Sequence, residues 1–114
     1  MHELGTVFYV IKEVEKLCDE NELTKVGSVT LQIGEVSGII PEYIVDCWNW
    51  AIKESKYMQE AELKVETLEA VTFCEDCKGV YGTVAHGKIC PYCGSDRTWL
   101  QTGNEVNIKE ILVE

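Results

Sequence analysis

The chain has little positive charge. Ten lysine and arginine residues stand against twenty aspartate and glutamate residues, which gives a formal net charge of -10 and a pI near 4.6. Proteins that bind nucleic acid normally need a basic patch that replaces the counterions on the phosphates. The composition therefore argues against a nucleic-acid surface, and we expect no nucleic-acid partner.

A long uninterrupted hydrophobic run and a basic leader are also missing. Lysine and glutamate interrupt the apolar start of the chain, MHELGTVFYVIKEVEKL, and no small-residue cleavage site is present there. This pattern is neither a signal peptide nor a membrane span. We therefore expect a cytoplasmic protein with no membrane partner, whose cysteine pairs bind metal in a reducing compartment.

Internal repeats, low-complexity segments and catalytic motifs are absent as well. The sequence offers no nucleophile with an adjacent base and no phosphate-binding loop, so we expect no enzymatic activity. Its 114 residues suffice for one domain, or for one small core with a metal-stapled appendage. Because 46% of them are hydrophobic, the chain can fold and is not a disordered tail.

What the chain does have is two C-x-x-C pairs, Cys74–Cys77 and Cys90–Cys93, separated by twelve residues. Each pair folds into a tight turn, so that four thiolates can reach one tetrahedral ion. Four sulfur ligands leave no open position for water or substrate, and the predicted zinc is therefore structural. We expect Gly79 and Gly94, which follow the two pairs, to supply the unusual backbone angles of such turns.

Apolar residues at helical spacing predict two amphipathic helices. The first ends near Asn21, and Pro41 opens the second. The predicted buried positions are Leu4, Val7, Phe8, Ile11, Val14, Leu17 and Cys18 in the first helix, and Ile44, Cys47, Trp48, Ala51 and Ile52 in the second. Trp50 is expected to flank this second stripe. The two unpaired cysteines, Cys18 and Cys47, are interpreted as packing residues rather than ligands.

Alternating apolar residues predict three strand regions. The first contains Val29–Ile33, the second begins near Leu63 and runs through Phe73 into the first cysteine pair, and the third covers 99–113 with a break at Gly103. The predicted fold is α+β: two helices packed on a small three-stranded mixed sheet, with a zinc-ribbon-like module inserted before the last strand. We expect residues 1–72 and 98–114 to form the α+β domain, and residues 73–97 the zinc module.

The amino terminus, Met1-His2-Glu3, carries a second chemical signal. The terminal amine, the deprotonated backbone nitrogen of His2 and its nearer ring nitrogen can share one plane, an arrangement that selects Ni(II) or Cu(II). The fourth position is open to Glu3, to His86 or to a ligand from a partner protein. Histidine at position two arises by chance in about one chain in forty, so this signal is weak by itself.

The whole chain resembles the HypA/HybF family of nickel metallochaperones. The matching segments are Met1-His2-Glu3, the stretch 31–38 (LQIGEVSG) with Pro41-Glu42, both C-x-x-C pairs with Gly94-Ser95, and the closing segments Gly103-Asn104-Glu105 and Val113-Glu114. Several separated motifs in the same order make this resemblance more specific than the cysteine pairs alone.

The resemblance implies a protein that binds nickel and delivers it during maturation of nickel-iron hydrogenase, and in some bacteria of urease. It implies zinc at Cys74, Cys77, Cys90 and Cys93, and nickel at His2 with Met1 and Glu3. The implied partners are the GTPase HypB, the hydrogenase large subunit or its maturation complex, and urease accessory proteins. Ni2+ is then the transported ion and Zn2+ the structural one.

Two other classes of function fit the cysteine pairs. A zinc-ribbon adaptor could bind nucleic acid or a transcription complex, but only Lys78 and Lys88 supply positive charge between the pairs. A thiol-disulfide enzyme could use Cys74 and Cys77, although such enzymes carry one pair beside a β-α-β pattern. Zinc content measured against free thiols separates this last alternative from a metal centre.

Overall fold

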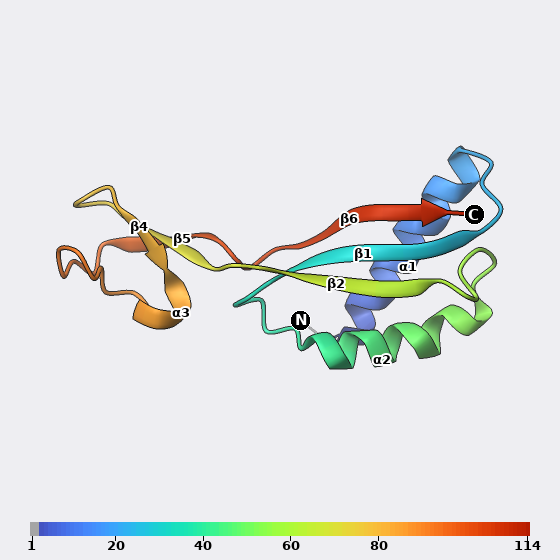
Figure 1. Cartoon of the computed structure of the whole chain (residues 1–114), viewed down its shortest axis with the longest axis horizontal. Helices are drawn as coiled ribbons and strands as arrows, with labels where there is room; N and C mark the ends of the chain where they lie inside the picture. Colours follow the sequence, from blue (N-terminus) through green and yellow to red (C-terminus); the bar gives the residue numbers. More distant parts are fainter. Residues whose placement is uncertain (1–2) are drawn as a thin grey trace.

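The computed structural model describes residues 3–114 and shows an elongated molecule of 54 × 26 × 17 Å with two lobes (Figure 1). The main lobe comprises α1 (Glu3–Glu20), β1 (Val26–Gly34), α2 (Pro41–Ala51), the one-turn 3-10 helix η1 (Ile52–Glu54), β2 (Glu62–Leu68) and β6 (Val106–Val113). The small lobe comprises β3 (Val71–Cys74), β4 (Val80–Gly82), α3 (Thr83–His86) and β5 (Thr98–Thr102). Each lobe is built on its own three-stranded sheet.

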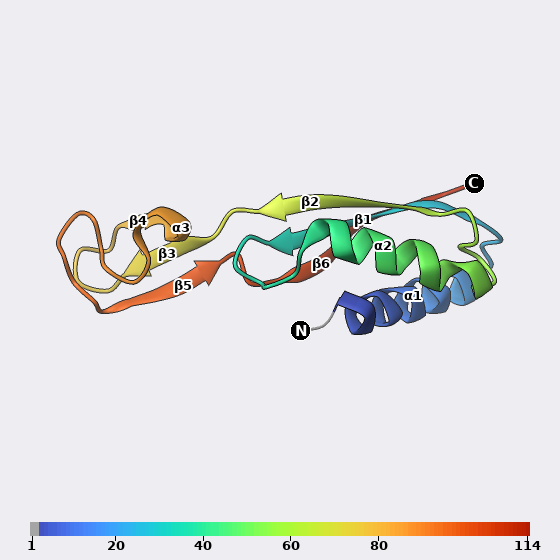
Figure 2. The same cartoon turned by 90° about the horizontal axis from the view of Figure 1, so that it is seen from below.

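The sheet of the main lobe has the strand order β2-β1-β6. Strands β1 and β2 are parallel and are connected through α2, whereas β6 runs antiparallel to β1. Both long helices pack on one face of this sheet (Figure 2). The mixed three-stranded sheet, its two helices and the insertion before the last strand confirm the predicted α+β fold.

The buried face of α1 differs in part from the predicted one. The residues of α1 that are buried are Thr6, Val7, Val10, Ile11, Val14 and Cys18. Leu4, Phe8 and Leu17, which were predicted to be buried, are 40 to 48% exposed. The helical period was therefore right, but the stripe of apolar residues is wider than the face that the sheet and α2 cover.

Helix α2 begins at Pro41, as predicted, because proline lacks the N–H that the first turn leaves unpaired. Trp48 is fully buried, and its indole N–H donates to the carbonyl oxygen of Ala61 at 3.0 Å. Trp50 is 62% exposed and its ring meets that of Phe8 edge-on, with centroids 6.4 Å apart. One tryptophan thus belongs to the core and the other flanks it, which confirms the prediction. Cys47 and Ala51 are only half-buried.

The small lobe contains an antiparallel sheet of order β4-β3-β5 that the sequence did not predict. The expected continuous strand from Leu63 into the first cysteine pair is wrong, because β2 ends at Leu68 and β3 begins at Val71 in the other sheet. Strand β4 and the single turn of α3 were also missed. Among the described residues, no helix combines the length and apolar character that a membrane span requires.

Two glycines form the junction between the lobes. A Cβ atom on Gly34 would lie 2.0 Å from the carbonyl oxygen of Gly103, and one on Gly103 would lie 2.3 Å from the Cα of Ala70. Carboxylates close the same junction. The side chain of Glu35 accepts from the Ala70 N–H at 3.0 Å, and that of Glu105 accepts from the Gly103 N–H at 2.7 Å. Hydrogen bonds from backbone N–H groups, first that of Gly103 and then those of Glu105 and Asn104, lower the pKa of the Glu105 carboxyl. The lobes therefore meet through close backbone packing.

Candidate metal centre

The four cysteines of the two C-x-x-C pairs come together in the small lobe. Their Sγ atoms all lie within 4.8 Å of one another. The Sγ atoms of Cys74 and Cys93 are 3.6 Å apart, as are those of Cys77 and Cys90. Cys74 and Cys90 are buried, whereas Cys77 and Cys93 are exposed. The sequence prediction that these four side chains share one centre therefore agrees with the observed arrangement.

The sulfur positions fit a tetrahedral zinc ion. A Zn–S bond of about 2.3 Å places the sulfurs of a regular tetrahedron about 3.8 Å apart, close to the two observed separations of 3.6 Å. A disulfide would need about 2.05 Å between sulfurs, and the cysteines are free. Four thiolates at these positions could hold one ion and would leave no open position for water or substrate.

The two cysteine turns have the same hydrogen bonds. In the first turn, the Lys78 N–H donates to the Cys74 carbonyl at 2.9 Å. In the second, the Gly94 N–H donates to the Cys90 carbonyl at the same distance. The N–H groups of Cys74 and Cys90 in turn donate to the carbonyls five residues later, each at 2.9 Å. Each turn is therefore held in shape by its own backbone.

The residue directly after each pair has a left-handed conformation, but the glycine prediction was only half right. Gly94 has φ 74° and Lys78 has φ 63°, so a lysine occupies in the first turn the place that glycine has in the second. Gly79 does not have a positive φ. A Cβ on Gly79 would lie 3.1 Å from the ring of Tyr92, so this glycine is needed for close packing between the turns.

This difference predicts opposite effects of two substitutions. Gly94→Ala should weaken zinc binding by about 1 kcal/mol, or about fivefold, because a side chain is strained in the left-handed region. Lys78→Gly relieves about 1 kcal/mol of the same strain and adds about 0.5 kcal/mol of chain entropy to the unfolded state. A net stabilisation of about 0.5 kcal/mol is expected from these two terms. Competition with a chromophoric chelator measures the zinc affinity of both variants. If Lys78→Gly bound zinc no more tightly than the unsubstituted chain, strain at Lys78 would be contradicted.

Charged side chains connect the two turns. Asp76, inside the first pair, receives a hydrogen bond from the Arg97 guanidinium at 2.9 Å and another from the Ser95 hydroxyl. Glu75 accepts from the indole N–H of Trp99 at 2.6 Å. Exposed ion pairs contribute little individually. Their role here is to fix the direction in which the second turn leads into β5.

The thiols differ in acidity. Burial opposes ionisation of Cys90, but the backbone N–H groups of Cys93 and Tyr92 point to its sulfur and lower the pKa of Cys90 to about 7. At Cys93 the N–H of Ser95 favours the thiolate, yet desolvation and the neighbouring thiols outweigh it and raise the pKa of Cys93 to about 12. A bound cation must therefore displace protons from the cluster, which is the usual behaviour of thiolate metal sites.

The small lobe has almost no other core. Its buried hydrophobic cluster contains Cys74, Tyr81 and Cys90 alone among the described residues. Two of these three are predicted metal ligands, so burial of apolar surface cannot hold the small lobe together without a metal cross-link.

Of the predicted nickel ligands, the two that the structure describes, Glu3 and His86, lie outside this cluster. Met1 and His2 are outside the described residues. Glu3 begins α1, and its carboxylate accepts from the Ile40 N–H, at the start of α2, at 3.2 Å. His86 ends α3 in the small lobe, where its ring meets that of Tyr81 edge-on at 5.9 Å. Figure 1 places α3 and the start of α1 in different lobes, so the described structure does not bring Glu3 and His86 together.

The remaining cysteines lie in the main lobe. Cys18 lies on the buried face of α1. Burial raises the pKa of its thiol, with a further contribution from the carboxylates of Asp19 and Glu15. Cys47 is half-buried on α2 and packs against the same core. Neither thiol joins a group of potential metal ligands within the described part of the chain.

Comparison with known proteins gives one consistent result. A family model described as hydrogenase/urease nickel incorporation, metallochaperone, hypA, matches residues 1–113. The hydrogenase maturation factor HypA of Actinobacillus succinogenes is 32% identical over 114 residues, with both chains covered completely. That of Geotalea uraniireducens is 30% identical over 115 residues, again with complete coverage of both.

Solved structures agree with the sequence comparison. The solution structure of the Ni metallochaperone HypA from Helicobacter pylori superimposes with a TM-score of 0.76 at 25% identity. The match covers 99% of this chain and 97% of that one. The likeness therefore includes both lobes and the order in which the chain connects them.

Proposed function

The chain belongs to the HypA family of metallochaperones for nickel incorporation into hydrogenase and urease, and from this premise we propose that it binds Ni(II) at its amino terminus. It would deliver the ion during maturation of nickel-iron hydrogenase, and of urease where that enzyme is present. The observation that carries the proposal is the Met1-His2-Glu3 start in a chain whose residues 1–113 match the family.

The proposed ligands are the amine of Met1, the backbone and ring nitrogens of His2, and a fourth donor. Planar nitrogen donors favour Ni(II), and each nitrogen must give up its proton to bind the ion, so nickel affinity should fall as the pH is lowered. Glu3 is the first candidate for the fourth donor because it directly follows His2. Its contact with Ile40 ties the start of α1 to the start of α2. His86 is the second candidate, and it would require the lobes to approach each other or a second copy to contribute.

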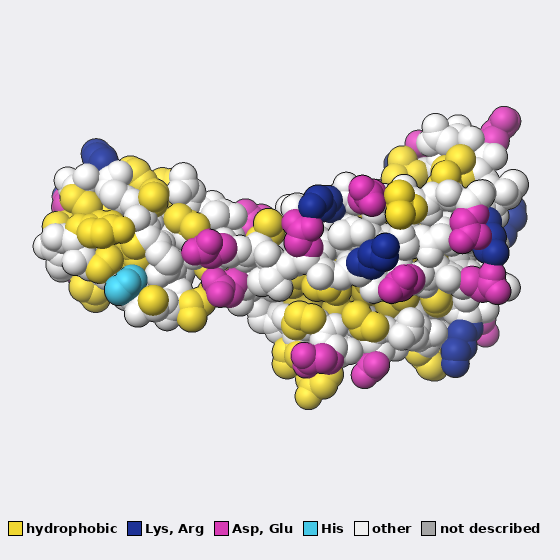
Figure 3. All heavy atoms as spheres, viewed as in Figure 1, with side chains coloured by type: hydrophobic (Ala, Val, Ile, Leu, Met, Phe, Trp, Pro, Cys, Tyr) yellow, Lys and Arg dark blue, Asp and Glu magenta, His cyan; other side chains and the backbone are white. Residues whose placement is uncertain are grey.

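The charge distribution supports a cation cargo in the main lobe. Residues 71–102 contain three acidic and three basic side chains, so the rest of the chain carries the whole net charge of -10. Figure 3 shows acidic side chains spread over the visible face of the main lobe, whereas the visible face of the small lobe shows several hydrophobic side chains and few charged ones. A negative field raises the local concentration of cations. The ion would therefore be attracted to the lobe that begins with the amino terminus.

We assign the four cysteines to a structural Zn2+ and the small lobe to its support. The predicted division, with residues 1–72 and 98–114 as the nickel domain and 73–97 as the zinc module, is part of this proposal, with the small lobe extended to 71–102 because β3 and β5 belong to its sheet. The chain would act without catalysis, by holding and transferring an ion. Its free thiols suit a reducing compartment, which is why we place it in the cytoplasm.

The proposed partners are the GTPase HypB, the hydrogenase large subunit or its maturation complex, and urease accessory proteins. The family's role in hydrogenase and urease nickel incorporation supports accessory and maturation partners of this kind. The alternative of a zinc-ribbon adaptor for nucleic acid or a transcription complex has less support, because the small lobe has no net positive charge.

His2→Ala tests the nickel site. Loss of a group that only supports a metal ligand weakens metal binding by about 10- to 100-fold. Loss of the ligand itself should weaken Ni(II) binding by more than this. Zinc content should not change, because the cysteines lie in the other lobe. Calorimetric titration of the zinc-loaded protein with Ni(II) measures the effect.

His86→Ala tests the fourth ligand separately. A partial loss of affinity is expected if His86 closes the plane, and none if Glu3 or a partner does. Wild-type nickel affinity in His2→Ala would refute the site.

A further inference from the structure

Strand β6 forms an open edge of the main sheet. The order β2-β1-β6 leaves one side of β6 without a paired strand among the described residues. In Figure 1 this strand runs along the outer border of the main lobe. An open edge presents backbone N–H and C=O groups that an extended peptide can pair with.

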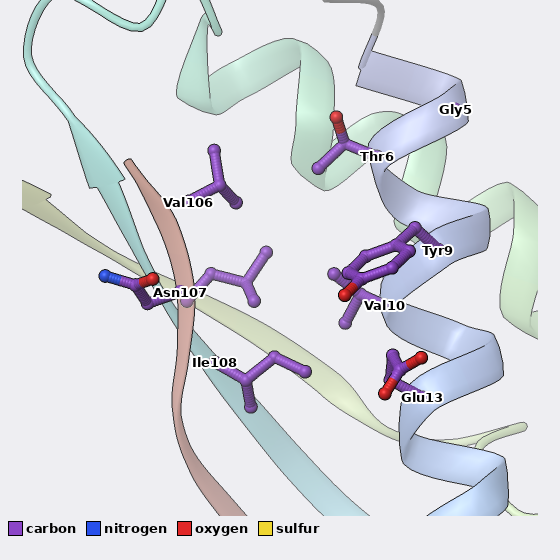
Figure 4. Close-up of a pocket in the computed structure, with 9 residues that line it drawn as sticks. Gly5, Thr6, Tyr9, Val10, Glu13, Val106, Asn107 and Ile108 are labelled. Atoms are coloured by element: carbon purple, nitrogen blue, oxygen red, sulfur yellow. The ribbon is translucent and has the colours of Figure 1, made fainter. Parts of the chain in front are cut away.

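A cavity of about 580 Å³ lies directly beside this edge, between β6 and α1. It is lined by Gly5, Thr6, Tyr9, Val10, Glu13, Leu31, Val106, Asn107 and Ile108. In Figure 4 the side chains of Val106 and Ile108 point from β6 towards α1, where Tyr9 and Glu13 face them. The cavity is therefore mostly apolar, with one carboxylate in its wall.

One feature leaves the cavity open and another leaves the strand edge without a protecting charge. Gly5 contributes no side chain, and a Cβ atom built on it would meet nothing within 4 Å. Lys109, the charge that could protect the edge, is turned across the sheet instead. Its Nζ lies 2.6 Å from Glu66 of β2. The usual protection of an edge strand by an outward lysine is thus absent at this position.

We propose that the β6 edge and this cavity bind an extended segment of a partner polypeptide as a fourth strand. Backbone hydrogen bonds to β6 would hold the segment, and its alternate side chains would enter the cavity. The segment would carry apolar residues at alternate positions and a lysine or arginine that reaches Glu13. Charge selects the basic residue, because the cavity wall holds a carboxylate and the surrounding lobe is strongly acidic. This site goes beyond the proposed nickel function and does not depend on it.

The test uses the zinc-loaded full chain and a set of eight-residue peptides. Valine, isoleucine or leucine alternates with threonine in each peptide, and one lysine replaces each apolar residue in turn, because these positions face the cavity and Glu13. NMR titration should show amide shifts confined to β6 and the facing side of α1. N-methylation of alternate amides on the pairing edge of the best peptide should weaken binding at least about tenfold, because it removes the ladder hydrogen bonds.

Matched protein variants separate the cavity from the edge. Glu13→Gln should weaken binding of the lysine peptide about three- to tenfold. Binding of the same peptide with threonine in place of lysine should not change. Glu20→Gln, on the same helix but outside the cavity, should change neither. Gly5→Leu should fill one end of the cavity and weaken binding of every peptide. The helix should not be weakened, because leucine favours a helix more than glycine does.

Three results would overturn the proposal. The first is that no peptide of the set binds below about 1 mM, an affinity worth only about 4 kcal/mol. The second is equal binding of the N-methylated peptide. The third is concentration-dependent shifts at β6 without peptide, together with dimers in sedimentation, because a second copy of the chain would then cover the edge.

Discussion

Cys90→Ala is expected to abolish tight zinc binding and to unfold the small lobe while the main lobe stays folded. A structural zinc site contributes about 10–16 kcal/mol of binding free energy, and three thiolates cannot close the tetrahedron. Without the metal, the small lobe retains a buried cluster of only three residues, one of which is Cys90 itself. Amide hydrogen exchange should show loss of protection across 71–102 and retention of protection in α1 and β1.

Cys47→Ala is the matched control, because Cys47 is a half-buried thiol outside the cluster. It should retain one zinc per chain. Full zinc content and unchanged protection of the small lobe in Cys90→Ala would contradict the four-thiolate centre.

Gly103→Ala should destabilise the protein by about 2–4 kcal/mol, through backbone strain and overpacking. Gly103 has φ 114°, and its Cβ would lie 2.3 Å from the Cα and 2.6 Å from the Cβ of Ala70. Both atoms belong to or adjoin backbone, so no side chain can move aside. Denaturant unfolding of the zinc-loaded protein, followed by far-ultraviolet circular dichroism, measures the loss mainly through α1 and α2.

Gly38→Ala separates the two causes. Gly38 also has a positive φ, 83°, but a Cβ there would meet nothing within 4 Å. The expected cost is about 1 kcal/mol, from the left-handed conformation alone. If both alanine variants lost the same free energy of unfolding, close packing at the junction would not contribute to the cost of Gly103→Ala.

The sequence predicts the clustering of the four cysteines well because residue type and spacing are local properties. Two pairs of cysteines, each closed by its own backbone hydrogen bonds, need no knowledge of the rest of the fold. The helices and the mixed sheet are equally visible in the spacing of apolar residues. Pro41, for example, marks the start of α2 without any tertiary information.

The errors arise where distant segments meet. Leu4 and Phe8 have the right helical spacing, but nothing in their own helix reveals that the covered face is centred on Val10. Similarly, alternation continues from Leu63 to Phe73, but the strand is interrupted near Ala70, where Gly103 approaches closely. Such limits come from packing between residues far apart in the chain.

The left-handed residue after the first cysteine pair is a different kind of error. Glycine at 79 was the natural candidate for the positive φ, yet the turn places this conformation at Lys78. The second turn gave the correct signal, since Gly94 directly follows Cys93 just as Lys78 directly follows Cys77. Comparison of the two turns would have identified the position. The cavity beside β6, in contrast, leaves no pattern in the sequence.

The most direct test of nickel binding at the amino terminus is calorimetric titration of Ni(II) into two zinc-loaded chains. One begins at Met1, and the other carries Gly-Ser ahead of Met1. Because the proposed chelate uses the terminal amine, the extended chain should lose tight nickel binding, whereas the same two residues added after Glu114 should have no effect. Equal nickel affinity of the chain that begins at Met1 and the chain extended before it would contradict the proposal, because the terminal amine could then not be a ligand.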